Sequence, residues 1–178
     1  MIYKAVCAFI LSAVAWSSLL SQSLPMDDET GKVTYEEIVD QPGSQQELYN
    51  RALDWFNNFY TNARVVIEEK EPDKGKITAR PKFMLQIQDK KGVNTDVGFI
   101  IYSLKVWVKD NKFRYRITDI HLQYTVYYGI EKWMDPNHED AENNPAKLNN
   151  IDTYFQDLIA SLKEGMKPKK PEKDEDDW

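Results

Sequence analysis

The sequence predicts an α+β domain in which an antiparallel five-stranded sheet carries two helices on one face, in the order β-α-β-β-β-β-α. Three observations support this fold class. Tyr102–Ile120 contains two runs of alternating polar and apolar residues joined by a polar turn, which is typical of a hairpin with one buried face. Residues 44–62 and 150–165 instead repeat apolar residues with a helical period. Strong turn signals separate short strand-like segments between these two helices.

The first 23 residues are predicted to be a signal peptide that is removed on export. Lys4 is the only charged residue before Asp27, and Ala5–Leu20 is almost wholly apolar or small. This run is shorter than the ~20 apolar residues that a membrane-spanning helix needs. Small residues at Ser21–Ser23 offer a cleavage site, and Ala13–Ala15 is a second candidate. An uncleaved membrane anchor is the alternative interpretation.

Charge and cysteine content narrow the classes of function. Cys7 is the only cysteine and lies in the predicted signal peptide, so the mature chain would hold no disulfide and no cysteine nucleophile. Loss of residues 1–23 removes Lys4 and no acid, which leaves 22 basic against 29 acidic residues and a net charge of −7. Nucleic-acid binding relies on a positive field and is therefore not expected. We expect a periplasmic or extracellular protein with no stable membrane span after cleavage.

The single folded domain is expected to span residues 31–166, after a short acidic linker at residues 24–30. Gly31–Asp40 is predicted to form the first strand, because apolar residues alternate near its start. The turn residues Pro42–Gly43 follow and end this strand.

The first helix is predicted to begin at Ser44 and to end near Asn62. Ser44 and Glu47 have the spacing of a capping box, in which each side chain satisfies a backbone N–H at the start of the helix. Apolar residues form two adjacent stripes, so this helix must lie on an apolar surface. The stripes consist of Leu48, Ala52, Trp55 and Phe59, and of Tyr49, Leu53, Phe56 and Tyr60.

Two strands are predicted to follow the first helix. Arg64–Glu71 has β-branched residues at its centre, and the turn Pro72–Gly75 separates it from Lys76–Gln88. Pro81 cannot donate a ladder hydrogen bond, so it predicts a bulge or an edge position in the second of these strands.

Gly98–Lys109 and Lys112–Ile120 are predicted to pair about a turn at Asp110–Asn111. The alternation continues towards Tyr128, so the second arm is a candidate for a longer strand. This register pairs the following residues on the apolar face: Val108 with Phe113, Val106 with Tyr115, and Leu104 with Ile117. On the other, solvated face it pairs Trp107 with Arg114 and Lys105 with Arg116.

The remaining chain is predicted to form an irregular loop at residues 129–148, a last helix that begins near Asn150, and a disordered charged tail at residues 167–178. The loop contains breakers at Asp135–Asn137 and Asn143–Pro145. One face of the last helix carries Ile151, Phe155, Leu158 and Leu162.

Three segments carry a family resemblance: ELYNRALDWFNNFY (Glu47–Tyr60), VVIEEKEPDKGKITAR (Val65–Arg80) and LKVWVKDNKFRYRITDI (Leu104–Ile120). Together with the helix Ile151–Leu162, they resemble a family of exported bacterial proteins of unknown function with a TATA-binding-protein-like (TBP-like) fold. The resemblance covers roughly residues 31–166 and implies a signal peptide and the β-α-β-β-β-β-α order. It implies no established activity and no catalytic residues. The loop at 129–148 and the charged tail match nothing in the family.

The sequence contains no recognisable catalytic or metal-binding motif. It lacks a Gly-rich phosphate loop, a Gly-x-Ser-x-Gly elbow and a His-Glu-x-x-His pair. His121 and His138 are the only histidines, and His138–Asp140 is expected to be a solvated acidic loop rather than a metal site. We therefore predict no cofactor, no metal and no assigned catalytic residue.

A basic patch on the solvated sheet face is the first candidate binding site, made of Lys105, Trp107, Lys109, Arg114 and Arg116. The functional interpretation is a surface for an anionic ligand, a glycan or an acidic partner. The structural interpretation is that Glu68, Glu69 or Glu71 neutralises the patch while arginine stems cover Trp107. Lys105 opposite Arg116 is a like-charge pair, which costs a few tenths to ~1 kcal/mol unless an acid or anion compensates it.

A cluster of aromatic residues near the irregular loop is the second candidate site, made of Tyr124, Tyr127, Tyr128 and Trp133. Such side chains stack on sugars or anchor a protein partner. The structural alternative is that they fold the loop back over the rim of the sheet, because so many exposed aromatic residues would form an adhesive surface.

These observations favour an exported cell-envelope protein that binds or scaffolds an unknown protein or glycan partner through its open sheet face. The alternative is a small hydrolase whose carboxylates meet only in the fold, and it predicts a deep pocket with two adjacent acids. Nucleic-acid binding is suggested only by the name of the fold, which does not determine function.

Overall fold

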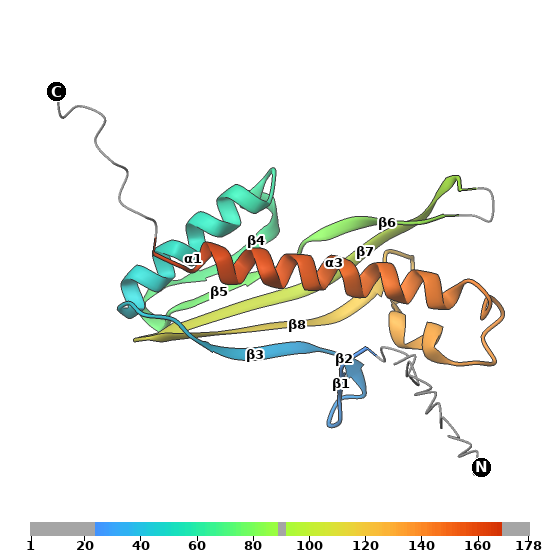
Figure 1. Cartoon of the computed structure of the whole chain (residues 1–178), viewed down its shortest axis with the longest axis horizontal. Coiled ribbons are helices and arrows are strands. Elements are labelled where there is room, and N and C mark those ends of the chain that lie inside the picture. The colour runs from blue at the N-terminus through green and yellow to red at the C-terminus, as the bar shows by residue number, and fades with distance from the viewer. Residues whose placement is uncertain (1–23, 89–91, 169–178) are drawn as a thin grey trace, which may run out of the picture.

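The computed structural model describes residues 24–88 and 92–168. The predicted signal peptide at residues 1–23 and almost all of the predicted charged tail therefore lie outside the described residues. The described chain forms two layers, with a long twisted sheet behind and the two main helices, α1 (Gln45–Phe59) and α3 (Asn144–Gly165), in front (Figure 1).

The main sheet has seven antiparallel strands among the described residues. They are β3 (Tyr35–Asp40), β4 (Ile67–Glu71), β5 (Lys76–Ala79), β6 (Lys82–Gln88), β7 (Asn94–Lys109), β8 (Lys112–Leu122) and β9 (Tyr128–Gly129). Their order across the sheet is β3-β8-β7-β5-β4, with β6 paired to the first half of β7 and β9 paired to the end of β8. The α+β class and the antiparallel pairing are as predicted, whereas the expected number of five strands is too small.

The hairpin β7–β8 has the predicted register. Val108 lies opposite Phe113, and Lys105 lies opposite Arg116. Burial alternates along both strands in the predicted sense. The buried residues on one face are Leu104, Val106, Val108, Phe113, Tyr115 and Ile117. The sequence therefore fixes which face of this hairpin meets the core and which meets solvent.

Pro81 divides the predicted strand Lys76–Gln88 into β5 and β6. Both segments pair with β7, one after the other along the same side of that strand. Since proline has no backbone N–H to donate, the ladder is interrupted at this position and β6 continues as an edge strand. This division accounts for part of the difference between the expected and observed numbers of strands.

Arg64–Val66 was predicted as strand but belongs to the short helix α2 (Ala63–Val66). Strand β4 begins only at Ile67, where it pairs with Ala79 at the end of β5. Before Ile67 the pairing reaches only the carbonyl oxygen of Val66, which accepts a hydrogen bond from the backbone N–H of Arg80 at 2.8 Å. Residues Ala63–Val66 form a separate short helix, because Tyr60 is extended and ends α1. Val65 is consequently 78% exposed in spite of its β-branched side chain.

The capping box of α1 forms as predicted. Ser44 Oγ accepts a hydrogen bond from the backbone N–H of Glu47, and the Glu47 carboxylate accepts one from the backbone N–H of Ser44 at 2.7 Å. The helix buries Leu48, Tyr49, Ala52, Trp55 and Phe56 against the sheet and α3.

Helix α3 begins at Asn144 rather than near Asn150 as expected. Pro145, interpreted above as a breaker, lies in the first turn of the helix, where its missing N–H costs nothing. The loop before α3 contains a short 3₁₀ helix, η2 (Ile130–Met134). A second, η1 (Pro72–Lys74), forms the predicted turn, in which Gly75 adopts a left-handed conformation.

The segment at residues 24–30, expected to be a linker, is part of the fold. It contributes β1 (Met26–Asp27), which pairs with β2 (Lys32–Val33) in a small separate hairpin. Leu24 is 5% exposed and belongs to the core. The predicted first strand at 31–40 accordingly consists of β2 and β3.

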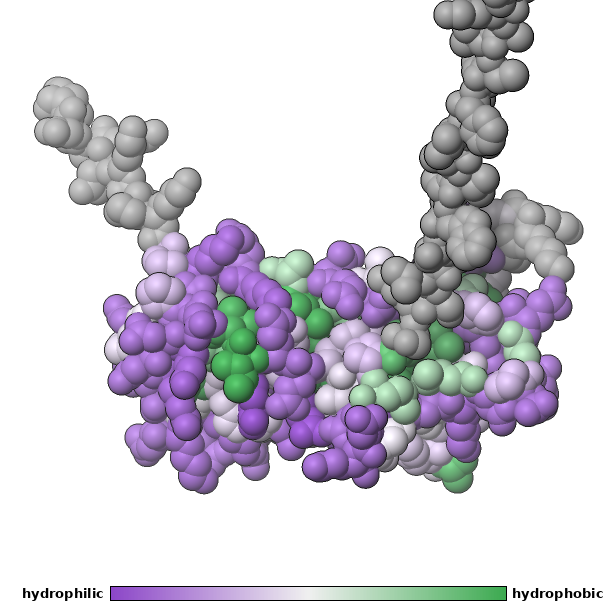
Figure 2. Space-filling view, turned by 60° about the horizontal axis from the view of Figure 1, so that its bottom comes forward, coloured by the Kyte–Doolittle hydropathy of each residue, from purple (hydrophilic) through white to green (hydrophobic). Residues whose placement is uncertain are grey.

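The surface along the lower edge of the molecule in Figure 1, where β3 lies, is mainly hydrophilic. Figure 2 shows separate apolar patches there, divided by polar side chains. In the part of the chain that the structure describes, no helix is both long enough and apolar enough to cross a membrane.

Candidate functional site on the helix-free sheet face

The sheet face that points away from α1 and α3, here called the helix-free face, carries its side chains in rows that cross the strands. One row runs from β3 through β8, β7 and β5 to β4, and consists of Glu36, Arg116, Lys105, Thr78 and Glu69. The next row in the same strand order consists of Ile38, Arg114, Trp107, Lys76 and Glu71. Cationic side chains thus occupy the middle strands, and acidic ones occupy the outer strands β3 and β4.

Arg116 is neutralised, but by acids other than those expected. Its Nη2 lies 2.7 Å from Asp27 Oδ2, and its Nε lies 3.3 Å from Glu36 Oε2. The second contact is an ion pair without hydrogen-bond geometry, since Nε is buried and has no aligned acceptor among the described residues. Arg116 therefore keeps one donor unused while its charge is balanced.

Arg114 covers Trp107, as the structural interpretation of the patch expects, and the two form a cation–π pair. The guanidinium carbon of Arg114 lies 4.1 Å from the centre of the Trp107 ring, and Arg114 Nη1 lies 3.5 Å from Glu36 Oε1. Of the three acids expected to neutralise the patch, Glu69 and Glu71 pair instead with Lys76, at 3.2 and 2.8 Å.

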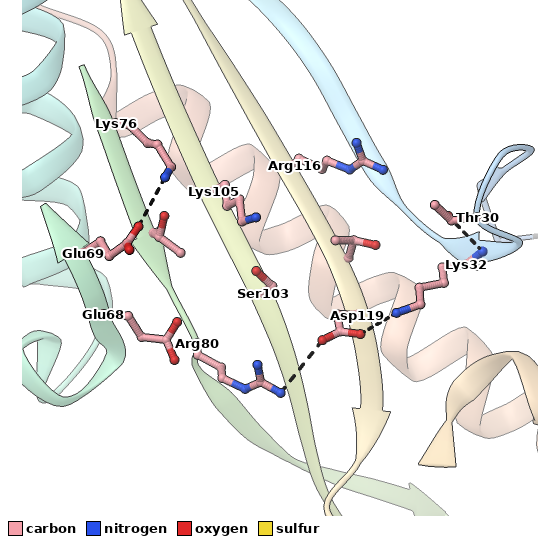
Figure 3. A pocket seen from close by; sticks show the side chains of 12 residues that line it. Thr30, Lys32, Glu68, Glu69, Lys76, Arg80, Ser103, Lys105, Arg116 and Asp119 are labelled. Atoms are coloured by element: carbon pink, nitrogen blue, oxygen red, sulfur yellow. Dashed lines mark hydrogen bonds and ion pairs between the residues drawn. The ribbon is translucent and has the colours of Figure 1, made fainter. Parts of the chain in front are cut away.

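Lys105 differs from its neighbours, because its ammonium group has no ion pair or hydrogen bond with any described residue. It faces Arg116 on one side and Thr78 on the other. Figure 3 shows it in the middle of a pocket, between Lys76 and Glu69 on one side and Arg116 on the other.

This pocket, here called the Lys105 pocket, has a volume of about 540 Å³ and opens on the helix-free face. Its walls come from β4, β5, β7, β8 and the β1–β2 hairpin. The lining residues are Thr30, Lys32, Glu68, Glu69, Lys76, Thr78, Arg80, Ser103, Lys105, Arg116, Thr118 and Asp119. Five are cationic, three are acidic and four carry hydroxyl groups, so the pocket has an excess of two positive charges.

Asp119 lies at a β-bulge in the wall of the Lys105 pocket. Between the pairs Ser103–Thr118 and Ile101–His121, β8 contains one residue more than β7, and Asp119 takes up the bulge with φ of 58°. Its carboxylate accepts hydrogen bonds from Lys32 Nζ at 2.7 Å and from Tyr127 Oη at 3.1 Å. The bulge thus turns this acid towards the pocket.

The protonation of Asp119 follows from these contacts. Burial is the largest single influence and raises the pKa of its carboxyl group. The hydrogen bond and the charge of Lys32, together with the hydrogen bond from Tyr127, outweigh burial, so the pKa lies below its ordinary value of 3.8. The hydrogen bond to Asp119 in turn raises the pKa of Lys32. Both side chains are therefore charged at neutral pH, and together with Arg80, 3.9 Å from Asp119, they form a fixed ionic cluster.

A second, smaller pocket of about 330 Å³ lies beside the first on the same face. Ile38 and Trp107 supply its apolar wall, and Ile38 is 64% exposed. Lys109 and Lys112, which face each other across the hairpin, supply charge at its end. All five predicted patch residues therefore share the helix-free face, and they divide between two neighbouring pockets.

The predicted aromatic site does not form one surface. Trp133 is 4% exposed and belongs to the core, so it is unavailable to a ligand. Tyr128 packs against it, with its hydroxyl bonded to His138 Nε2. Tyr127 stacks near His121, whereas Tyr124 is 70% exposed. Two of the four residues, Tyr128 and Trp133, thus pack against the fold, whereas Tyr127, at 50% exposed, and Tyr124 stay accessible to solvent.

The loop residues His138 and Asp140 also have partners in the structure. His138 bonds Tyr128, and Asp140 pairs with the buried Lys147 at the start of α3. Asp140 is therefore part of a structural contact and its pKa is lowered, chiefly by that lysine.

Sequence reasoning missed Lys32, Thr78 and Asp119 as members of the site. The alternation of Lys76 and Thr78 along β5 is a signal that could have placed Thr78 on the solvated face. No local signal places Lys32 beside Asp119, because 87 residues separate them in the chain.

Comparisons with known proteins identify relatives of this fold. A family model described as "Domain of unknown function (DUF4468) with TBP-like fold" matches residues 35–124. No curated protein matches the chain. A crystal structure of a TBP-like protein from Parabacteroides distasonis is similar with a TM-score of 0.65 and 22% identity, over 80% of this chain and 96% of that one. A DUF4468 family protein from Bacteroides ovatus is similar with a TM-score of 0.58 and 17% identity, over 81% of this chain and 91% of that one.

Proposed function

Since this chain belongs to the DUF4468 family of domains of unknown function with a TBP-like fold, we propose its role from its own residues: an exported, non-catalytic module that binds an envelope partner through the helix-free face. The observation that carries this proposal is the pair of adjacent pockets on a sheet face that no helix of the described residues covers. We propose a protein or a glycan as the partner, because the charged side chains of the two rows can bind its polar groups and the Trp107 indole can pack against it.

Export is supported by the N-terminal sequence. Ala5–Leu20 has the length and the apolar character of a signal-peptide core, and small residues follow at Ser21–Ser23. Without residues 1–23 the chain has no cysteine for a disulfide, and the fold relies instead on a continuous apolar core between the sheet and two helices. The location we propose is the periplasm or the outside of the cell.

The hydrolase alternative receives less support from the pocket. General acid–base catalysis by a carboxyl group needs a pKa close to neutral pH, so that the group can both hold and release a proton. Asp119 has a lowered pKa and an ion pair with Lys32, and Glu69 pairs with Lys76. Acids held in this way act as counterions, which favours the binding role.

The proposal is tested by capture of envelope components with the tagged full-length protein. Trp107→Ala removes the half-buried indole of the helix-free face and should lower the recovered partner by roughly tenfold or more, the usual effect of losing a central aromatic contact. Asp157→Ala changes an exposed residue of α3 on the opposite side and serves as the control.

Quantitative mass spectrometry of the captured material measures the result, and circular dichroism verifies that both variants are folded. Equal recovery with Trp107→Ala and the unmodified protein, or a loss confined to Asp157→Ala, would contradict the use of this face. Arg116→Ala is a poor test, because it would leave Asp27 and Glu36 without their shared counterion.

A further inference from the structure

We propose that the Lys105 pocket binds an acidic sugar, that is, a sugar bearing a phosphate, sulfate or carboxylate group. This inference rests on the proposed function in using the same face, and it adds the chemical class of the ligand. The anionic group would lie at Lys105, and the sugar would occupy the remainder of the pocket.

The first argument is the distribution of charge. Four of the five cations in the lining already have carboxylate partners: Lys32 with Asp119, Lys76 with Glu69 and Glu71, Arg80 with Asp119, and Arg116 with Asp27 and Glu36. Lys105 has none among the described residues, although the chain as a whole has a net charge of −6. An oxyanion beside Lys105 would also compensate the like-charge pair that Lys105 forms with Arg116.

The second argument is independent of charge and concerns donors without acceptors. Thr78 is 7% exposed, and its hydroxyl oxygen has no hydrogen-bond partner within the described residues. Arg116 Nε also lacks an aligned acceptor in the described ranges, but it lies 3.3 Å from Glu36 Oε2, so Thr78 carries this argument. Buried polar groups in native proteins nearly always have partners, so an unused donor in a pocket wall indicates a ligand. Thr78 lies directly opposite Lys105, on neighbouring strands ~4.8 Å apart.

The third argument concerns the size and chemistry of the remaining pocket. A volume of about 540 Å³ falls in the range of small-molecule sites, ~300–1,000 Å³, and exceeds what an isolated oxyanion fills. Ser103, Thr30 and Thr118 supply hydroxyl groups around the pocket, and the Glu68 carboxylate has no ion pair in the described part of the chain. Hydroxyl groups and a free carboxylate are suited to the hydroxyl groups of a sugar.

The experiment measures binding to the full-length protein by calorimetry at low ionic strength, because salt screens such contacts. The probes are glucose 6-phosphate, glucuronate, glucose and inorganic phosphate. We expect at least one of the two charged sugars to bind roughly tenfold more tightly than both glucose and inorganic phosphate, and the stronger one identifies the anionic group.

Two variants and a matched control locate the site. Lys105→Met should weaken binding of the charged sugar roughly tenfold. Lys70→Met removes the same charge from an exposed position of β4, outside both pockets of the helix-free face, and should leave binding unchanged. Thr78→Val should weaken binding while leaving the unliganded protein at least as stable, because it removes a hydroxyl group without a partner in the described structure.

Several outcomes would overturn the inference. They are no binding of either charged sugar at millimolar concentration, equal affinity for glucose, equal affinity for inorganic phosphate alone, or an equal loss with Lys105→Met and Lys70→Met. Folding is not a confounding factor, since Lys105→Met removes one member of a like-charge pair. Loss of partner capture by Trp107→Ala with no sugar binding would retain the proposed function and reject only this inference.

Discussion

Lys105 and Arg116 occupy equivalent positions across the β7–β8 hairpin, but their surroundings differ. Arg116 lies beside β3 and the β1–β2 hairpin, whose Glu36 and Asp27 balance its charge. Lys105 lies beside β5, which offers Thr78 instead of an acid. The sequence predicts that both cations share one solvated face, because alternation determines direction. It cannot predict which of them is neutralised, since the acids come from segments more than 75 residues away in the chain.

At the same scale, the ion pair of Asp119 with Lys32 leads us to expect that the stability of the fold depends on pH. Its pKa in the folded protein is lowered below 3.8 by Lys32, so the ionised carboxylate stabilises the fold above its ordinary pKa and loses this effect as the pH falls through the lowered value. Asp119→Asn removes the charge but tolerates the positive φ of the bulge. We expect it to lower the free energy of unfolding by ~1 kcal/mol at neutral pH.

Urea unfolding of both proteins between about pH 7 and about pH 3 measures this effect. The difference between them should shrink towards the acidic end, because the unmodified protein then also loses its charge. A difference that stays constant with pH would indicate that packing, rather than the ion pair, makes Asp119 important.

At the scale of elements, the ends of the predicted helices and strands depend on where a strand can find a hydrogen-bonding partner. The predicted capping box, the turn at residues 72–75 and the hairpin register are all present, because each depends on residues close in sequence. The predictions that failed needed a distant partner: α2 replaces strand where β5 ends before Pro81, and α3 starts early because Pro145 fits its first turn. Local patterns therefore predicted the elements, and tertiary pairing determined their ends.

Helices α3 and α1 pack closely at Gly165, where there is no space for a side chain. A Cβ at this position would lie 2.6 Å from Trp55 Cδ1, and the Trp55 indole is 5% exposed and donates a hydrogen bond to Ser161 Oγ at 3.0 Å. Alanine favours helix by ~1 kcal/mol over glycine, but overpacking a fixed aromatic ring costs ~1–3 kcal/mol. We expect Gly165→Ala to lower the free energy of unfolding by ~1 kcal/mol, through displacement of Trp55.

Urea unfolding monitored by tryptophan fluorescence measures the change. Glu164→Ala, at the exposed neighbouring position, is the control and should stay within ~0.5 kcal/mol of the unmodified protein. A stabilised Gly165→Ala variant would show that Trp55 can move without cost.

At the scale of the whole molecule, the two-layer arrangement was predictable because both helices and the hairpin have one apolar side that must be covered. The apolar sides meet in one continuous core, which includes Phe56, Ile117 and Phe155. The pocket was not predictable at this scale. It is formed where five separate segments meet, and only their long-range order brings Asp119, Lys32 and Lys105 to one place.

The fold also limits where the proposed signal peptide could be removed. Leu24 is buried in the core, and the carbonyl oxygen of Pro25 accepts a hydrogen bond from the backbone N–H of Thr34 at 2.8 Å. We therefore expect the mature protein to begin at or before Leu24, and the intact mass of the exported protein measures this. Removal of residues 24–26 should lower the free energy of unfolding by ~1.5–3 kcal/mol, the usual contribution of one buried leucine. A mature start beyond Leu24 with unchanged stability would contradict this limit.

The acidic residues on the outer strands have a consequence for the behaviour of the protein at high concentration. The outermost strands β3 and β4 carry three carboxylates each: Glu36, Glu37 and Asp40 on the first, and Glu68, Glu69 and Glu71 on the second. Unpaired backbone groups along such strands can recruit a further chain and start aggregation. Four of these carboxylates are paired with cations of the same chain, whereas Asp40 and Glu68 have no ion pair among the described residues. Two copies that approached along like strands would bring these unpaired charges together, so we expect edge-to-edge pairing to be disfavoured at neutral pH.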